Sequence, residues 1–334
     1  MQPFRMHRAA DVPGAIRAAA LSPTAQQGAK VRFLAGGTTL VDLMKLNVEQ
    51  PDDVVDISRL PLGDVNVGED GSVDIGATVS NADLAHHPHI SKAFPVLSEA
   101  LLSGASAQLR NVATTGGNLL QRTRCVYFRD PDMACNKRVP GSGCDARGGY
   151  NRNLAILGTS DACIASNPSD MNVALVALQA TIHIQGTAGP RSVLIDDFYL
   201  LPGETPDRET VLEPGDLITH VSLPALPTGA RSTYLKLRDR ASYEFALASA
   251  AVVVAMDAGR MTHVRLALGG VGTRPWHAVQ AESVLAGQMP SADLFRQAAD
   301  AALVDAHPQS ENAFKIELAR RCIVQALKNA TDVV

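Results

Sequence analysis

Aromatic residues are scarce in this chain of 334 residues. Phe, Trp and Tyr together make up 4% of the sequence, and there is a single Trp. Proteins that bind single-stranded nucleic acids stack the bases on aromatic side chains, and this chain has few to offer. The net charge of −4 provides no general attraction to a phosphate backbone either. The composition therefore speaks against nucleic acid as a partner.

A long hydrophobic run is also absent. The longest, Phe245–Met256, is bounded by acidic residues and is shorter than the roughly 20 apolar residues that a membrane-spanning helix needs. The first part of the chain has neither an apolar signal core nor a twin arginine. We expect no membrane insertion. We expect a periplasmic location if the chain is exported folded with a partner subunit that carries the signal, and a cytoplasmic location otherwise.

Cysteine is rare, but four of the five cysteines fall within one segment. Their spacing, C-x9-C-x8-C-x18-C, lacks the tight C-x2–4-C pairs of structural zinc sites. Disulfides suit small secreted domains better than a chain of this length. Four separated thiolates favour a [4Fe–4S] cluster, with zinc, disulfides or buried free thiols as the alternatives. Cys322 fits a small buried residue of the last helix. The predicted cluster ligands are Cys125, Cys135, Cys144 and Cys163.

The segment around these cysteines is basic. Between Gln121 and Leu154 there are seven basic and three acidic residues, so this part carries about +4 in a chain of net charge −4. Cations near an iron–sulfur cluster offset its negative charge and tune its potential. The same charges also fit a docking surface, with Lys137 and Arg138 turned toward an acidic partner. The sequence is compatible with both interpretations.

Strand and helix patterns mix without a regular βαβ alternation, which favours the α+β class. In the first half, short apolar strands such as Val31–Leu34 and Val54–Ile57 alternate with amphipathic helices. Residues 224–229, PALPTG, have the composition of a linker. Three strand patterns follow it and precede three helical patterns. The predicted C-terminal helices are near 278–285, 292–304 and 311–329.

Two short segments rich in glycine and threonine are candidate phosphate-binding loops. They are LAGGTTL, residues 34–40, and TTGGN, residues 114–118. Glycine lets the backbone N–H groups approach a phosphate at such a turn. Neither segment fits the Rossmann or P-loop pattern. Each alone is equally compatible with a tight turn and a helix cap, whereas two together suit the two phosphates of a dinucleotide.

Six segments in the same order carry a family resemblance: LAGGTTLVDLMK, IGATVSNADL, RNVATTGGNLL, NPSDMNVALVAL, LEPGDLI and LALGGVGTRPW. They resemble the FAD-binding medium subunit of the xanthine dehydrogenase and aldehyde oxidase (molybdenum hydroxylase) family, over nearly the whole chain. With the cysteine segment between TTGGN and NPSD, the chain is most similar to the FAD subunits of bacterial periplasmic aldehyde oxidoreductases. The medium subunit of 4-hydroxybenzoyl-CoA reductase also has a cluster-bearing insertion.

The resemblance implies a fold and a domain arrangement. Residues 1–225 would form a FAD-binding domain of the vanillyl-alcohol oxidase (PCMH) type. It would have subdomains at about 1–60 and 61–225 and a cluster-binding insertion at about 121–166. Residues 229–332 would form a C-terminal α+β domain of the CO dehydrogenase flavoprotein type, a β-sheet with three helices.

The resemblance also implies the cofactor contacts. Asp170 would lie near the ribose and adenine end, Leu217 and Ile218 would line the flavin ring, and Lys236 would approach the flavin from the C-terminal domain. Ser106 is a further expected contact. The first pyrophosphate loop would comprise Leu34, Ala35, Gly36, Gly37, Thr38, Thr39 and Leu40, and the second Thr114, Gly117 and Asn118.

The implied function is electron transfer. The sequence has no Ser/His/Asp set and no paired carboxylates at a useful spacing. By resemblance, the chain is the FAD- and [4Fe–4S]-binding subunit of a heterotrimeric aldehyde oxidoreductase, inactive on substrate alone. Its partners would be a small subunit with two [2Fe–2S] clusters, a large subunit with the molybdenum cofactor, and an external electron acceptor. The alternatives are the medium subunit of another molybdenum hydroxylase, a flavoprotein or scaffold with a structural zinc loop, and a self-sufficient flavin oxidase.

Overall fold

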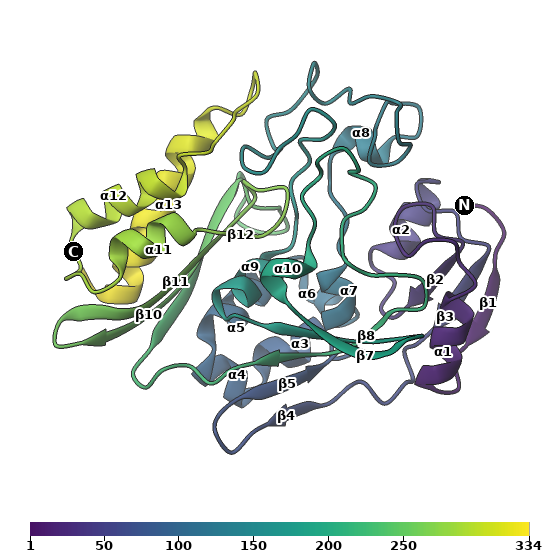
Figure 1. The fold of residues 1–334 in the computed structure, drawn as a ribbon, viewed down its shortest axis with the longest axis horizontal. Helices are drawn as coiled ribbons and strands as arrows, with labels where there is room; N and C mark the ends of the chain where they lie inside the picture. Colours follow the sequence, from purple (N-terminus) through teal and green to yellow (C-terminus); the bar gives the residue numbers. More distant parts are fainter. Residues whose placement is uncertain (334) are drawn as a thin grey trace.

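The computed structural model describes residues 1–333, which form three β-sheets and the helices between and around them (Figure 1). The first sheet is parallel, in the order β1-β3-β2. Asp11 caps the helix α1, which buries Ala15 and Ile16 in the small core beside this sheet. The sequence patterns missed β1 because all of its residues are exposed. These elements are β1 (Arg5–Arg8), α1 (Val12–Ala19), β2 (Val31–Leu34), α2 (Leu40–Lys45) and β3 (Asp53–Asp56).

The second sheet has five antiparallel strands in the order β4-β5-β8-β6-β7. Every second residue of β6 is buried, as expected for a sheet with one covered face. Its strands are β4 (Val65–Val67), β5 (Val73–Gly76), β6 (Thr181–Gly186), β7 (Gly189–Leu194) and β8 (Leu217–Leu223). The helices in this part are α3 (Asn81–His86), α4 (Pro88–Ala93), α5 (Pro95–Ser103), α6 (Ala107–Arg110), α7 (Thr115–Leu119), α9 (Asp170–Ala177) and α10 (Ile195–Phe198).

The third sheet is C-terminal, in the order β12-β11-β10-β9, and three helices cover one face of it (Figure 1). The predicted α+β class, including this sheet with three helices, is confirmed. No helix within residues 1–333 is long and apolar enough to cross a membrane. The elements are β9 (Arg231–Leu237), β10 (Ala248–Asp257), β11 (Arg260–Gly269), β12 (Trp276–His277), α11 (Val279–Leu285), α12 (Ala292–Ala302) and α13 (Phe314–Thr331).

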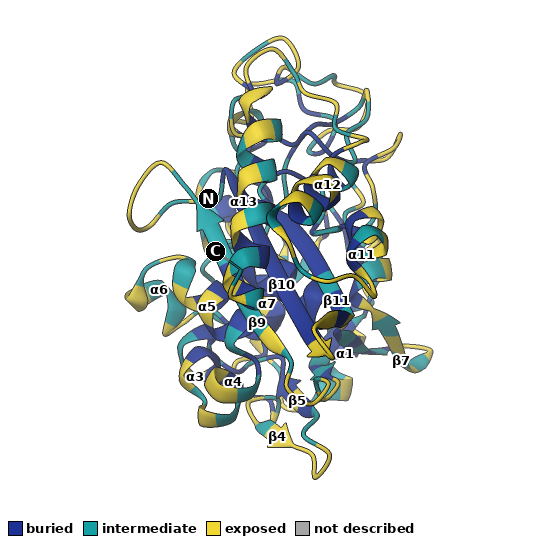
Figure 2. Cartoon of the chain, turned by 90° about the vertical axis from the view of Figure 1, so that its left-hand side faces the viewer, coloured by how far each residue is buried: buried dark blue, intermediate teal, exposed yellow. Residues whose placement is uncertain are grey.

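Strand β10 joins the two halves of the molecule because both of its faces are buried. Ala251 and Val253 belong to the same core as α5 and α9, whereas Val252 and Val254 belong to the core under the C-terminal helices. Figure 2 shows β10 and β11 in the buried colour beneath α12 and α13. A strand buried on both faces has a continuous apolar sequence, and this explains the longest hydrophobic run of the chain.

The segment with the four cysteines is a long irregular excursion at the top of the molecule in Figure 1. Its only helix is α8 (Val126–Arg129). The segment is nevertheless packed, because Phe128 and Leu154 form a separate small core with Leu43 of α2 and the cysteines. The cysteine loop, defined here as residues 121–166, thus rests on the N-terminal sheet region.

Candidate functional site: a cofactor cleft beside a cysteine loop

The two glycine loops lie against each other. A β-carbon on Gly36 would stand 1.9 Å from the carbonyl oxygen of Val112, so only glycine fits at this position. Gly37 has a φ of +72°, a conformation that favours glycine. Because Val112 and Ala113 lead directly into the segment Thr114–Asn118, the close approach at Gly36 brings the backbones of both loops together.

The second loop is held by its own side chains and by Ala77, the residue that follows β5. Thr114 caps α7, and its Oγ1 accepts a hydrogen bond of 3.2 Å from the Gly117 N–H. The Gly116 N–H donates to the carbonyl of Ala77, and a β-carbon on Gly116 would lie 3.2 Å from the same oxygen. The loop is therefore rigid and pressed onto the second sheet.

Both loops line one large cleft, with a cavity of about 250 Å³. Leu34 and Asn118 lie just outside this wall, and the Asn118 Oδ1 accepts a hydrogen bond of 2.7 Å from Ser169. The predicted cofactor residues that line the cleft are Ala35, Gly36, Gly37, Thr38, Thr39, Leu40, Thr114, Gly117, Leu217 and Ile218. The structure therefore brings together most of the predicted set.

Asp170 and Lys236 lie elsewhere, as a buried ion pair of 2.7 Å. The Tyr234 hydroxyl donates to the same carboxylate at 2.6 Å. Asp170 lines a second cavity of about 190 Å³, which shares Ser166–Pro168 with the first. Ser106 lines neither cavity and caps α6. Of the predicted residues outside the first cavity, only Asp170 lines the second, and Lys236 reaches it through its ion pair with Asp170.

Sequence reasoning missed a buried ionic network on the wall of the cleft. Arg32 makes two hydrogen bonds of 2.9 Å to Glu49, and Arg122 donates to Glu49 at 2.6 Å. Arg122 also forms an ion pair with Glu209, which receives a bond of 2.9 Å from Lys137. Burial would raise the pKa of Glu209, but Arg122 and Lys137 outweigh burial and lower it. Most of these partners are far apart in the sequence, so no local sequence pattern predicts that they pair.

The four predicted ligand cysteines converge in the small core of the cysteine loop. Cys135 and Cys144 face each other in an antiparallel bridge. Burial raises the pKa of the Cys125 thiol to about 12 and raises the pKa of Cys144 and Cys163 as well. The thiols of Cys125, Cys144 and Cys163 each lie close enough to other cysteines of the set for repulsion between thiolates to raise their pKa further. All five cysteines, which lie within the described residues, are free thiols.

This arrangement does not form a cage for a single ion. Among residues 1–333, no three Cys, His, Asp or Glu side chains converge tightly enough to hold one metal ion. Tetrahedral zinc needs thiolates about 3.8 Å apart, given Zn–S bonds of about 2.3 Å. A cluster with four irons takes one thiolate at each corner and needs a wider spread. The structure therefore shows four clustered thiols and, within residues 1–333, no group arranged to hold a single metal ion.

The basic residues of the cysteine loop are engaged within the chain. Arg124 and Arg129 pair with Asp42 of α2, at 3.1 and 2.8 Å. Arg147 pairs with Asp161 and Arg152 with Asp239, both within 3.0 Å. Arg124, Arg129 and Arg152 therefore meet acidic residues of the body, whereas Arg147 meets one within the loop itself.

The predicted docking role is wrong for Lys137, which does not lie on the surface. Lys137 is 8% exposed, and its Nζ donates to Glu209 and to the Pro206 carbonyl. Arg138 donates to the backbone carbonyls of Tyr127 and Phe128, which fastens the loop to itself. Lys137 is thus an internal anchor, because a buried carbonyl or carboxylate needs a donor that solvent cannot provide. Arg138 is half-buried and fixes the shape of the loop.

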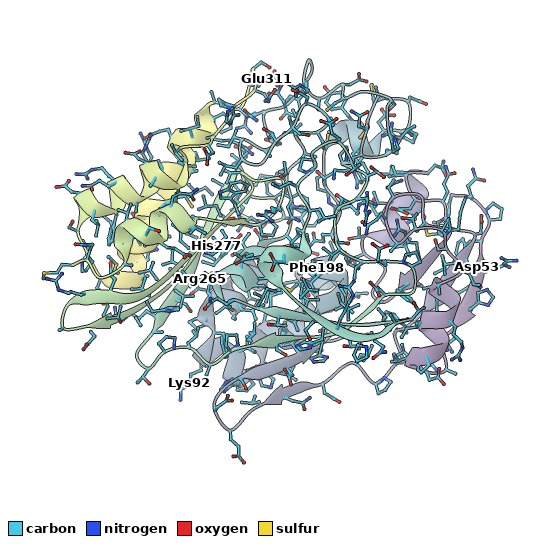
Figure 3. The ribbon with its side chains drawn as sticks, in the orientation of Figure 1. Asp53, Lys92, Phe198, Arg265, His277 and Glu311 are labelled. Carbon is cyan, nitrogen blue, oxygen red and sulfur yellow. The ribbon has the colours of Figure 1, made fainter. Side chains whose placement is uncertain are left out.

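The C-terminal part also supports the cysteine loop. The fully buried Lys315 donates to the carbonyls of Asn153, Leu154 and Gly270, at 2.7–3.0 Å. The Asn151 N–H donates to Glu311, which is labelled beside the loop in Figure 3. These bonds join the loop to the start of α13.

Comparison with known proteins agrees with this architecture. Residues 2–226 match the FAD binding domain in molybdopterin dehydrogenase, and residues 232–330 match the CO dehydrogenase flavoprotein C-terminal domain. The chain is 47% identical to the aldehyde oxidoreductase FAD-binding subunit PaoB of Escherichia coli, over 93% of this chain and 94% of that one. It is 28% identical to the glyceraldehyde dehydrogenase medium chain of Sulfolobus acidocaldarius, over 84% and 82%.

Among solved structures, carbon monoxide dehydrogenase from Hydrogenophaga pseudoflava aligns with a TM-score of 0.76. The sequence identity is 26%, and the alignment covers 99% of this chain and 98% of the other. Two family matches that together span nearly all of the sequence, and a relative at 47% identity, agree on one assignment. The chain belongs to the FAD-binding medium subunits of the molybdenum hydroxylase family, and is therefore an oxidoreductase subunit.

Proposed function

We propose that this chain is the electron-transfer subunit of a three-subunit aldehyde oxidoreductase and that it carries a [4Fe–4S] cluster in addition to FAD. The ligands of the cluster would be Cys125, Cys135, Cys144 and Cys163. A small subunit with [2Fe–2S] clusters and a large subunit with the molybdenum cofactor would be its partners. The aldehyde assignment is supported by the name of the 47% identical relative, an aldehyde oxidoreductase subunit.

The observation that carries the proposal is where the thiols lie relative to the two cavities. Cys163 lines the first cavity and Cys125 lines the second. A cluster held by these residues would therefore be adjacent to the cofactor cleft. When bound, the flavin supplies exchange between electron pairs and single electrons, and the cluster carries single electrons.

The residues of the chain would position the cofactor. The backbone of the loops at Gly36–Thr39 and Thr114–Gly117 would face the pyrophosphate, with donors fixed before the cofactor binds. The two ends of the FAD would then extend toward Leu217 and Ile218 on one side and toward Asp170 on the other. The ion pair of Asp170 with Lys236 keeps the carboxylate in place at 2.7 Å.

Iron analysis and absorption spectroscopy of the purified complex test the cluster. We expect about four irons per chain beyond those of the partner subunits, and broad absorption near 400 nm. Replacement of any one of the four cysteines by serine is expected to abolish or degrade the cluster, because a thiolate ligand is lost. Cys322→Ser is the matched control, since Cys322 is buried against the C-terminal sheet, and its iron content should equal that of the wild type.

Two outcomes would overturn the proposal. Stoichiometric zinc without additional iron would make the loop a structural zinc site. Aldehyde oxidation by the single purified chain would contradict a subunit that depends on a molybdenum partner. The FAD-binding assignment to the family would survive the first of these results, because it depends on the domain matches and not on the cysteines.

A further inference from the structure

One ionic network on the cleft wall contains one more cation than anion. The buried ionic network contains three cations and two anions, Arg32, Arg122 and Lys137 against Glu49 and Glu209. The other charged residues on the wall have partners of their own: Arg208 pairs with Glu213 at 2.9 Å, and Asp216 pairs at 2.6 Å with Arg191, which lies off the wall. A buried charge without a partner is costly. The network therefore has one cation available to an anion from outside its own five residues.

Arg122 is the member best placed to meet that anion. Its guanidinium is fixed by Glu49, by Glu209 and by the ring of Phe128, 4.8 Å away. Its Nη2 is nevertheless buried without a hydrogen-bond partner in the chain. Arg32, by contrast, is satisfied by Glu49 and by the carbonyls of Ala25 and Gln26. Lys137 is satisfied by Glu209 and Pro206.

Both Arg122 and Lys137 belong to the cysteine loop, yet both line the cofactor cleft. They converge on Glu209, which comes from the loop between α10 and β8. We infer that the cysteine loop is part of the FAD site: Arg122 supplies positive charge to the pyrophosphate of the cofactor, and Glu209 holds Arg122 in position. A guanidinium paired with a phosphate forms strong charge-assisted hydrogen bonds. The inference rests on the family's FAD binding and goes beyond it, because it assigns a cofactor role to the cysteine-bearing segment.

The competing source of the anion is the cysteine site. Cys163 lines the same cleft, and Lys137 favours its thiolate form, although burial has the larger and opposite effect on its pKa. If the network served only the cysteines, the loss of Arg122 would reduce iron and leave FAD binding unchanged. The two sources therefore predict different results for the same substitution.

The test uses the assembled complex, depleted of flavin and titrated with FAD or with riboflavin, which lacks the pyrophosphate. For Arg122→Met we expect FAD affinity to fall about 10- to 100-fold, riboflavin affinity to stay unchanged and iron content to be retained. Lys137→Met removes the same charge from the same network and is the matched comparison. It should affect iron retention more than FAD affinity.

Unchanged FAD affinity in Arg122→Met would overturn the inference, and so would an equal loss of riboflavin binding or a loss of iron alone. If Arg122→Met loses both FAD and iron through misfolding, the variant Arg122→Lys distinguishes a role in FAD binding from a purely structural role. That variant keeps a positive charge but lacks Nη2. Retained iron with weaker FAD binding supports the inference, and wild-type affinity refutes it. If the wild-type complex does not bind FAD, the result counts against FAD binding by this subunit. If the wild-type complex contains no additional iron, the result counts against the cluster proposal.

Discussion

At the scale of the residue, Gly36 decides whether the two glycine loops can meet. The position is not strained, but a side chain there would collide with the Val112 carbonyl at 1.9 Å. Gly37 is different, because its requirement is conformational, with φ at +72°, and a β-carbon there would meet only side-chain atoms at 3.0 Å or more. The two adjacent positions therefore require glycine for different physical reasons: lack of space at Gly36 and backbone conformation at Gly37.

We predict that Gly36→Ala removes FAD and destabilises the chain by at least about 1–3 kcal/mol, because the two backbones must separate. Flavin absorbance per chain and the melting temperature measure both effects. Gly148→Ala is the control. It lies in the cysteine loop with no atom within 4 Å of the added carbon, and its φ is ordinary. A Gly36→Ala protein with full flavin content would show that the loops do not need this close approach.

At the scale of the element, a cluster of charges fastens β12 and α11 to the loop at α10. His277 contacts Asp196 at 3.0 Å and Glu282 at 2.9 Å, and Arg265 lies beside both carboxylates (Figure 3). Burial lowers the pKa of His277, but the hydrogen bonds to Asp196 and Glu282 outweigh it and raise the pKa to about 9. The imidazolium is therefore the form that the fold prefers.

This pKa predicts a pH-dependent contribution to stability. A group whose pKa is higher in the folded state stabilises the fold fully below its unfolded value, about 6.5 for histidine. The contribution, at most about 3 kcal/mol, is lost as the pH rises from about 6.5 to 9. We expect His277→Gln to be less stable than the wild type at pH 6 and nearly equal to it above pH 9. Urea unfolding across this range measures the difference, and a difference independent of pH would contradict the assignment.

At the scale of the whole molecule, the two halves share a packed layer instead of meeting at a loose interface. Helices α5 and α9 contact the second sheet, and β10 belongs to the same core. The ion pair of Asp170 on α9 with Lys236 on β9 crosses this layer at 2.7 Å, and both side chains are buried. Two of the predicted cofactor contacts therefore also take part in the packing between the two halves.

We predict that Lys236→Met destabilises the protein by about 3–5 kcal/mol, because it leaves the Asp170 carboxylate buried without a cation. The double variant with Asp170→Asn should recover part of this loss. Chemical denaturation of the single and double variants gives the coupling free energy. Lys92→Met, at an exposed position of α4 (Figure 3), is the matched control and should change stability by less than about 0.5 kcal/mol. Additive effects at Asp170 and Lys236 would rule out the pair as a unit.

The sequence by itself determined the elements that depend on local pattern. The glycine loops, the central strand with its apolar run, the C-terminal sheet with three helices and the cysteine cluster all follow from residue type and short spacing. The family resemblance added the FAD-binding fold. The predicted strand and helix boundaries agree with the structure where apolar periodicity is strong. The strand β1 was not predicted, because its four residues are all exposed and carry no apolar pattern.

Only the tertiary structure decided which charges meet. The sequence showed an excess of basic residues around the cysteines, but not that Arg129 finds Asp42 at a separation of 87 positions, or Arg122 finds Glu49 at 73. It placed Lys137 on a surface, whereas Glu209 holds it inside, 72 positions away. Apolar periodicity is a local property that a sequence displays directly, whereas an ion pair depends on which distant segments the fold brings together.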